Sequence, residues 1–223
     1  AYNISSPSVM AIPAQVQNPA ETAAALARVL GADESVILKQ LTKDEYIVKL
    51  QPAGRKLSRE KALEVIALNL AGIVVAEDNR RYYPFGSLAS HVLGFTGIDN
   101  QGLTGVELYY NHLLSGVRGS VTSLTDAKGR AIPHTSDEYV PPKDGMHLQL
   151  TIDKQIQSIV EREREQAMIQ HEPNQVLAIA MDPNTGEVLA MASKPDYEPD
   201  KYREVPQEIY NRNLPIWMTY EPG

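Results

Sequence analysis

The amino-acid sequence predicts an α+β fold in which helices and antiparallel strands follow one another irregularly. Apolar residues recur at helical spacing between residues 18 and 70 and again after residue 153. Two apolar runs, residues 176–181 and 187–192, flank a strong turn sequence and predict a β-hairpin. Of the 223 residues, 43% are hydrophobic and 22% are charged, which is typical of a globular protein with a buried core.

The first predicted helix begins at Asn18 and ends near Leu30. Asn18 is a favourable cap, Pro19 suits the first turn and Glu21 stands where a capping box needs its acid. Gly31 then terminates the helix. A shorter helix follows, and its apolar side comprises Val36, Ile37 and Leu41.

Two strands and a third helix are predicted next. Residues 46–50 (Tyr-Ile-Val-Lys-Leu) are rich in β-branched and aromatic residues and predict a strand. Ser58 can cap a helix that Gly72 ends, and residues 73–77 predict another strand. Apolar residues recur at helical spacing within that helix at Leu63, Ile66 and Leu70.

The middle of the chain combines short helices with loops. Residues 88–93 and 106–114 predict helices, with four glycines between them. Residues 120–145 are typical of strands broken by polar, proline-containing turns. This composition is the best indication of a domain boundary, which we place between residues 140 and 141.

The C-terminal part predicts a strand, a long helix and the hairpin. Residues 147–151 alternate as a strand does, and Asp153 can cap the helix that follows. One face of this helix is expected to carry Ile156, Ile159, Val160, Ala167 and Met168. The continuous apolar run 176–181 predicts a strand buried on both faces, and residues 182–186 (Asp-Pro-Asn-Thr-Gly) predict the turn.

Composition excludes several function classes. The net charge of −7 disfavours a nucleic-acid partner. The absence of cysteine excludes disulfides, zinc-thiolate sites and cysteine catalysis. No stretch approaches the roughly 20 apolar residues of a membrane span, and no signal peptide is predicted at the start.

Three ordered motifs resemble a known family. Residues 81–84 (Arg-Tyr-Tyr-Pro), followed by residues 87–94, resemble the pedestal-domain signature of the class B penicillin-binding proteins. Residues 102–119 resemble the next signature of the same domain. Residues 150–157 and 182–192 resemble the opening of the transpeptidase domain. Each motif alone is weak evidence for the resemblance, whereas the three motifs in this order are specific for the family.

The resemblance covers about residues 75–223. Within the family, the chain is similar to the monofunctional division and sporulation enzymes of Gram-positive bacteria. Residues 211–223 resemble the segment that leads into the catalytic serine, where Pro-Gly is followed by a Ser-x-x-Lys helix. The resemblance implies a pedestal, or dimerisation-type, domain over residues 1–140. It implies the N-terminal part of a transpeptidase domain over residues 141–223.

Members of this family are peptidoglycan D,D-transpeptidases. A serine attacks the penultimate D-Ala carbonyl of a stem peptide, D-Ala leaves, and an amine of a second stem takes the acyl group. The resemblance therefore implies a membrane-anchored parent enzyme on the extracytoplasmic face of the bacterial membrane. It also implies that the chain ends just before its nucleophile and is itself a non-catalytic scaffold and interaction module.

The implied partners belong to cell-wall synthesis. The pedestal is expected to contact a polytopic glycan polymerase and other cell-wall or divisome factors. Stem peptides and β-lactams are expected to bind only the intact parent, and no cofactor is implied.

A rival interpretation is an autonomous serine acyl enzyme that uses Ser58 and Lys61. Residues 58–61 are a literal Ser-x-x-Lys, residues 109–111 a Tyr-x-Asn, and residues 143–145 differ by one residue from Lys-Thr-Gly. The order is that of the family's three catalytic motifs. The alternative reading is structural, because Ser58 suits a helix cap and residues 59–61 a solvated first turn.

Structural roles are also expected for the other notable side chains. Arg80 and Arg81 could bind an anion, but we expect them to pair with local carboxylates. We expect Glu107 to be the buried partner of an arginine, Asp153 to cap a helix and Asp182 to shape a turn. The five histidines (91, 112, 134, 147 and 171) lack ligand spacing, so no metal site is predicted. Trp217 and Tyr220 are expected to fill core space. No residue is predicted to be catalytic or to bind a cofactor.

Overall fold

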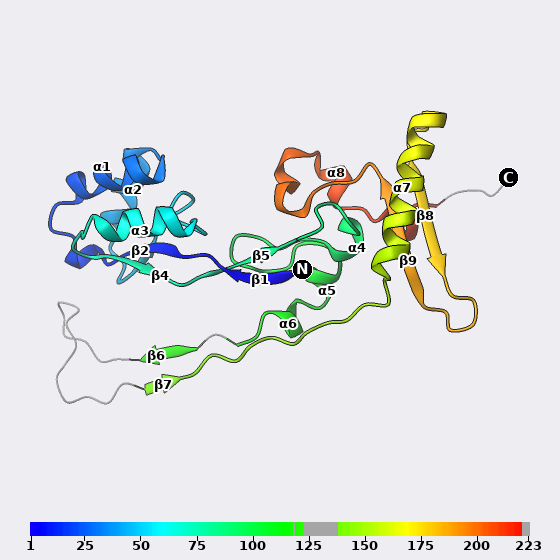
Figure 1. The fold of residues 1–223 in the computed structure, drawn as a ribbon. Helices are drawn as coiled ribbons and strands as arrows, with labels where there is room; N and C mark the ends of the chain where they lie inside the picture. The colour runs from blue at the N-terminus through cyan, green and yellow to red at the C-terminus, as the bar shows by residue number, and fades with distance from the viewer. Residues whose placement is uncertain (118, 123–137, 220–223) are drawn as a thin grey trace. The chain divides into compact units, whose positions relative to one another are not determined.

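The computed structural model describes residues 1–117, 119–122 and 138–219, and the chain divides into two compact units. The N-terminal unit comprises Asn3–Arg80 and Gly119–Pro141, and the C-terminal unit comprises Ala1–Tyr2, Arg81–Arg118 and Pro142–Gly223. Strands β1 (Tyr2–Ser5) and β5 (Asn79–Tyr82) pair where the chain passes from one unit to the other. Helices and antiparallel strands occur in both units, which confirms the predicted α+β fold (Figure 1).

The N-terminal unit is built on a small antiparallel sheet with the strand order β3-β2-β4. Its strands are β2 (Ser8–Ala11), β3 (Val48–Lys49) and β4 (Ile73–Ala76). The short turn η1 (Pro13–Gln15) and three helices accompany them: α1 (Pro19–Leu30), α2 (Glu34–Leu41) and α3 (Arg59–Ala67). Buried side chains from all of these helices and from β2 form one hydrophobic core, which includes Val9, Leu26, Leu41, Leu50 and Val65.

Helices α1 and α3 start where predicted, but the Asn18 side chain makes no capping hydrogen bond and α3 ends at Ala67 instead of Gly72. Two apolar faces also differ. Helix α1 begins at Pro19, and Gly31 closes it in the left-handed conformation (φ 65°). In α3 the buried positions are the smaller Ala62 and Val65, while Leu63 and Ile66 are more than half exposed. Val36 of α2 is likewise exposed, and the strand expected over residues 46–50 is shortened to β3.

Strands β6 (Ser120–Thr122) and β7 (Glu138–Val140) form an antiparallel pair. This agrees with the strands expected within residues 120–145. The turns expected between them fall on residues 123–137, which lie outside the described residues.

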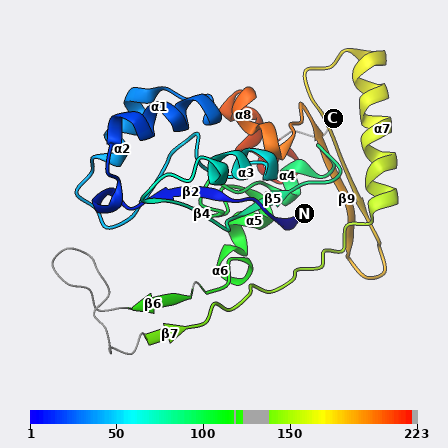
Figure 2. The same ribbon diagram turned by 60° about the vertical axis from the view of Figure 1, so that its left-hand side comes forward.

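The C-terminal unit consists of a helix-covered hairpin and a set of short helices. Helix α7 (Lys154–His171) lies along one face of the hairpin formed by β8 (Val176–Met181) and β9 (Val188–Lys194) in both views (Figure 1, Figure 2). The short helices are α4 (Ser90–Leu93), α5 (Gly105–Tyr109), α6 (Asn111–Leu114), η2 (Pro199–Glu204), α8 (Gln207–Tyr210) and α9 (Leu214–Trp217).

Three expectations for this unit are wrong. Residues 147–151 form no strand. The backbone of this segment first bonds to β9 at Asp153, whose N–H donates to the Leu189 carbonyl (2.8 Å). The helix expected over residues 106–114 is interrupted at Tyr110, which separates α5 from α6. Strand β8 is covered on one face only in the described part of the chain. Its exposed face carries Leu177, Ile179 and Met181.

Two glycines allow α4 and α5 to approach each other closely. Gly94 (φ 73°) ends α4, and a Cβ there would collide with the Thr104 carbonyl. Gly105 (φ 57°) begins α5, and its Cβ would lie 2.6 Å from the Val92 carbonyl. Both positions therefore require glycine for conformation as well as for space.

Candidate functional site

The Ser-x-x-Lys match at residues 58–61 forms the start of a helix. The Ser58 hydroxyl accepts a hydrogen bond from the Lys61 backbone N–H at 3.3 Å, as a cap does. All four residues of the motif are exposed. A lysine that activates a serine is desolvated beside the hydroxyl, whereas Lys61 lies in water. The prediction that Ser58 caps a helix is confirmed.

The other two motif matches lie in the C-terminal unit and take structural roles. The Asn111 side-chain oxygen accepts a hydrogen bond from the Gly102 N–H at 2.8 Å. Lys143 forms an isolated β-bridge with Val117, with backbone bonds of 2.8 and 2.9 Å. The expected pairing of an arginine with a buried carboxylate is confirmed. The Arg81 guanidinium donates to the Glu107 carboxylate at 2.7 Å.

Two further expectations are confirmed. Asp153 caps α7 and accepts hydrogen bonds from the backbone N–H groups of Gln155 and Ile156 (2.8 and 2.9 Å). Asp182 shapes the hairpin turn by accepting from the Asn184 N–H at 2.8 Å. These local roles follow from short sequence spacing.

The side chains through which α7 bonds to β9 are polar, whereas the residues of the expected apolar face are partly buried except for Ile159, which is exposed. Gln157 is fully buried, and its side chain bonds both backbone groups of Met191 (2.8 and 2.9 Å). It also donates to Glu161 at 2.7 Å. Glu161 in turn accepts from the N–H of Ala89 (2.8 Å), whose backbone is left-handed (φ 54°). Helix α7 is thereby tied to both β9 and the start of α4.

An ion-pair cluster continues this polar face. Arg164 is buried and donates to the Ser193 carbonyl (2.7 Å) and to Asp196 (2.6 Å). Lys194 contacts the other oxygen of Asp196 at 2.9 Å. Burial by itself raises the pKa of Asp196, but the bonds from Lys194 and Arg164 outweigh it and hold the pKa below its usual value.

His91 connects α4 with β9 and α8. Its Nε2 lies 2.9 Å from the Ile209 carbonyl, and its Nδ1 lies 3.3 Å from the Ser193 hydroxyl. Burial lowers the pKa of His91, although the Ile209 carbonyl and Asp196 favour the charged form. The neutral ring with a proton on Nε2 satisfies both neighbours.

We call Gln157, Glu161, Arg164, Lys194 and Asp196 the α7 network. Sequence reasoning missed it because apolar residues were used to define the helix face. A signal was present, since polar residues recur at positions 153, 157, 161 and 164, at the spacing of one helix face.

A cluster of aromatic rings also packs within the C-terminal unit. Phe95 stacks on Tyr202 with 4.0 Å between ring centres, and Tyr197 and Tyr210 meet Phe95 edge-on. The Tyr197 hydroxyl donates to the Ser90 carbonyl at 3.0 Å, and burial raises the pKa of Tyr197 to about 12. These rings fix residues 197–210 against α4.

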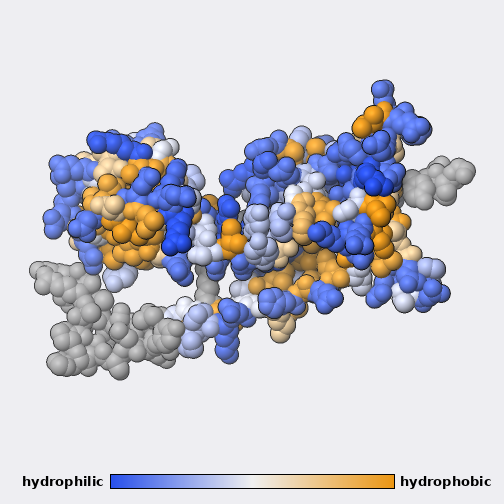
Figure 3. Space-filling view, viewed as in Figure 1, coloured by the Kyte–Doolittle hydropathy of each residue, from blue (hydrophilic) through white to orange (hydrophobic). Residues whose placement is uncertain are grey.

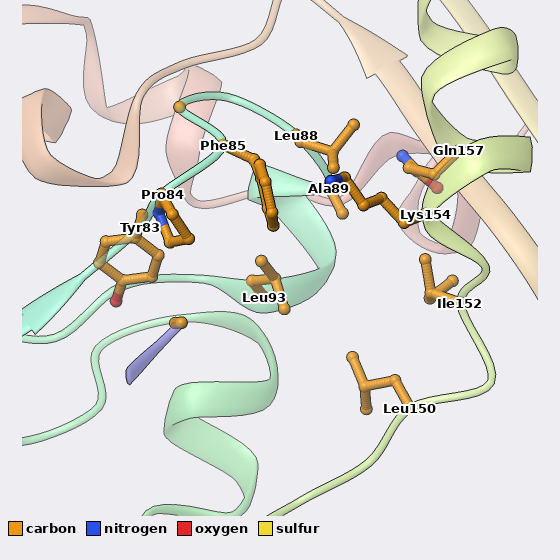
Figure 4. A pocket seen from close by; sticks show the side chains of 12 residues that line it. Tyr83, Pro84, Phe85, Leu88, Ala89, Leu93, Leu150, Ile152, Lys154 and Gln157 are labelled. Carbon is orange, nitrogen blue, oxygen red and sulfur yellow. The ribbon is translucent and has the colours of Figure 1, made fainter. Parts of the chain in front are cut away.

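A small cavity of about 190 Å³ lies between residues 83–93 and residues 150–157. Its side chains are mainly apolar and face one another from these two segments (Figure 4). The Lys154 ammonium lies 3.8 Å from the centre of the Phe85 ring, a cation–π contact. Tyr83 also lines the cavity, and burial raises the pKa of its phenol.

A larger cavity of about 540 Å³ lies between α4, α5, β9, α8 and α9. We call it the aromatic cavity, after the rings in its lining: Tyr109, Tyr110, Tyr210 and Trp217. Trp217 was expected to fill core space, but among the described residues it is 59% exposed, with the Arg212 guanidinium stacked on its ring. Tyr220, the other residue of that expectation, lies outside the described residues, as does the terminal Glu-Pro-Gly.

Metal and membrane features were searched only where the structure describes the chain. Within those ranges no group of three or more potential ligands is placed to hold a metal ion, and His134 lies outside them. No helix of the described residues is long and apolar enough to cross a membrane.

Two family models match the chain. The penicillin-binding protein dimerisation domain matches residues 1–150, and the penicillin-binding protein transpeptidase domain matches residues 176–223. The junction between the two matches is spanned by α7, whose network ties the second segment to α4 in the first.

Curated relatives and solved structures agree with these matches. The chain is 52% identical over its whole length to stage V sporulation protein D of Bacillus subtilis, and it covers 34% of that protein. It is 37% identical over 76% of its length to peptidoglycan D,D-transpeptidase FtsI of Escherichia coli, of which it covers 28%. The fold is similar to penicillin-binding protein 2X of Streptococcus thermophilus, with a TM-score of 0.59 and 24% identity over 90% of this chain and 33% of that one.

Proposed function

The chain belongs to the class B penicillin-binding proteins, and we propose that the whole protein is a peptidoglycan D,D-transpeptidase that cross-links the bacterial cell wall. The observation that carries the proposal is the match to both domains in order, with relatives that bear this name. The chain spans about a third of the length of these relatives, so the activity is assigned to the whole protein.

We propose that residues 1–223 contain no catalytic residue and that the nucleophile lies outside them. Residues 1–140 would serve as the pedestal and residues 141–223 as the first part of the transpeptidase domain. The exposed, helix-capping state of Ser58 supports this assignment. The bonds from α7 to both α4 and β9 support a positional role, because they fix one family segment against the other.

We further propose that the whole protein acts at the extracytoplasmic face of the membrane. Its pedestal would contact a glycan polymerase and other cell-wall or divisome factors. The match to the dimerisation domain and the sporulation and FtsI relatives support this cell-wall context.

Acylation by penicillin G tests the assignment. The 223-residue chain and the whole protein are each incubated with penicillin G, and their intact masses are measured. We expect one covalent adduct on the whole protein and none on the 223-residue chain, since acylation requires the nucleophile.

The rival interpretation predicts the opposite result for the short chain. An adduct that disappears in the Ser58→Ala variant would establish Ser58 as a nucleophile and overturn the non-catalytic assignment. Far-ultraviolet circular dichroism shows whether each sample is folded. Absence of an adduct on a folded whole protein would overturn the transpeptidase assignment.

A further inference from the structure

His91 connects three elements of the C-terminal unit through its two ring nitrogens. The residue belongs to α4, its Nε2 lies 2.9 Å from the Ile209 carbonyl in α8, and its Nδ1 lies 3.3 Å from the Ser193 hydroxyl in β9. The Tyr197 ring meets the imidazole edge-on, with 5.1 Å between the ring centres. We call the two hydrogen bonds of His91, to Ser193 and to Ile209, the His91 bridge.

The two partners of the His91 bridge fix the protonation state of the ring. A backbone carbonyl can only accept a hydrogen bond, so Nε2 carries the proton that is donated to Ile209. Nδ1 of the neutral ring is therefore an acceptor, and the Ser193 hydroxyl donates to it. A second proton on Nδ1 would force this hydroxyl to turn and would leave its hydrogen without an acceptor. Ser193 is 1% exposed, so water does not replace the lost bond.

The charged side chains that face the ring act in opposite directions. Arg164 of α7 opposes a positive ring, whereas Glu161 of α7 and Asp196 after β9 favour one. Both carboxylates already accept hydrogen bonds from other members of the α7 network. Burial has a larger effect than any of these charges and lowers the pKa of His91. Phenols from other elements also lie around the ring: Tyr109, Tyr110, Tyr197 and Tyr210.

The cost of charging His91 is therefore mainly a cost of burial. Hydrophilic side chains cover much of the visible surface of the C-terminal unit, where water solvates a charge (Figure 3). His91 is partly buried instead, and protein groups engage both of its ring nitrogens. The charged ring is better solvated when α8 leaves α4 and β9 than when the three elements are in contact.

We propose that the His91 bridge is a pH-sensitive contact that holds α8 against α4 and β9 at neutral pH and releases it under mildly acidic conditions. The open state binds a proton more readily than the closed state does. The closed state is therefore most stable above the pKa of a free histidine, about 6.5, and loses stability as the pH falls through that value.

The His91 bridge joins the two family segments. Helix α4 lies in the segment that the dimerisation domain matches, whereas β9 and α8 lie in the segment that the transpeptidase domain matches. Acidification would therefore loosen the contact between these segments. This regulation is additional to the proposed function and does not depend on it.

Hydrogen exchange of the whole protein, resolved by peptide, tests the inference. The amides of Ile209 and Asn211 report on α8, since their N–H groups donate to the carbonyls of Pro206 and Gln207. Exchange rates at about pH 7.5 and about pH 5 are each divided by the intrinsic rate at that pH, which gives the population of the open state. We expect this population to rise about 10- to 30-fold at the lower pH, and about 30-fold is the limit for a ring that stays neutral in the closed state.

Two comparisons show that the change belongs to α8 and to His91. The pKa of Asp196 is lowered, so the stability that this carboxylate contributes is lost only below about pH 4. Helix α1 is the internal control, because it belongs to the other compact unit. Its exchange, corrected in the same way, should not change between the two pH values.

Substitutions separate His91 from other groups that titrate. His91→Gln removes the titrating ring and should make the exchange of α8 independent of pH over this range. His112→Gln is the matched control and should keep the full response, because His112 is exposed and lies on α6 of the same unit. Ser193→Ala provides a second test if His91→Gln fails to fold. Without the hydroxyl the neutral ring loses its donor, so the pH response should shrink about fivefold, the usual effect of one hydrogen bond.

Three results would overturn the inference: an open population that does not change with pH in the unaltered protein, an unchanged pH response in His91→Gln, or loss of the response in His112→Gln. An increase of equal size in α1 would overturn it as well, since the whole protein would then unfold and α8 would not be released by itself.

Discussion

Glu107 and Arg81 illustrate how single residues hold the C-terminal unit together. The Glu107 side chain is 7% exposed and receives a hydrogen bond from Arg81 at 2.7 Å, while Arg81 is 20% exposed. Removing either charge takes this ion pair away from a side chain that is largely buried. The pair also joins the Arg-Tyr-Tyr-Pro motif to α5, so it fixes the loop before α4 against the helix that lines the aromatic cavity.

The Glu107→Gln variant should lower the free energy of unfolding of the C-terminal unit by about 2–3 kcal/mol, because it replaces a charged, largely buried hydrogen-bond acceptor of Arg81 with a neutral one. Urea unfolding followed by Trp217 fluorescence measures the change. Glu163→Gln is the matched control, since the Arg162–Glu163 pair has side chains 67% and 61% exposed. Its effect should stay within about 0.5 kcal/mol. Equal effects of the two variants would contradict the structural role of Glu107.

At the scale of elements, the side-chain caps at the starts of α3 and α7 could be predicted from sequence and the buried faces of the helices could not. Asp153 and Ser58 bond backbone groups two or three residues away, so local sequence contains the whole interaction. The buried face depends on what lies opposite. In α3 the small side chains of Ala62 and Val65 are buried, whereas those of Leu63 and Ile66 are exposed to solvent.

Helix α7 shows the same limit for polar residues. Opposite Gln157 lies the backbone of Met191, whose N–H and carbonyl need partners that no apolar side chain provides. The candidate site could be predicted only in part for this reason. The Arg81–Glu107 pair follows from expected charge pairing, whereas the contact of the Asn213 amide with Met191 depends on the arrangement of β9 and α9.

Replacement of Gln157 by leucine should destabilise the contact between α7 and β9 by about 3 kcal/mol. The side chain keeps a similar volume, but the Met191 backbone loses both bonds and Glu161 loses one donor. Denaturant unfolding and hydrogen exchange at Met191 measure the effect. Gln166→Leu, at an exposed position of the same helix, is the control and should change stability by less than about 0.5 kcal/mol. Fast exchange at Met191 already in the unaltered protein would contradict the interpretation.

At the scale of the whole molecule, the family matches and the compact units divide the chain differently. The dimerisation-domain match ends at residue 150, but residues 81–118 of that match share a compact unit with residues 142–223. The motifs that carry the resemblance between residues 81 and 107 therefore pack with the transpeptidase segment. Sequence composition could not indicate this, because it registers changes along the chain and not contacts between distant segments. The domain boundary that we place between residues 140 and 141 stays a prediction.

Each unit has its own hydrophobic core, which predicts unfolding in two steps. The N-terminal core draws on residues between Val9 and Val75, whereas the C-terminal cluster is built on Phe95, Tyr83 and Tyr197. Val65→Ala, at a position 2% exposed, should destabilise the first core by about 2 kcal/mol and leave the Trp217 transition in place. Phe95→Leu should shift the Trp217 transition by about 1–2 kcal/mol and spare hydrogen exchange in α1. Hydrogen exchange resolved by peptide, recorded through a urea series beside Trp217 fluorescence, separates the two steps. If either substitution moved both transitions equally, the units would unfold as one cooperative body, and the division into two cores would not describe its energetics.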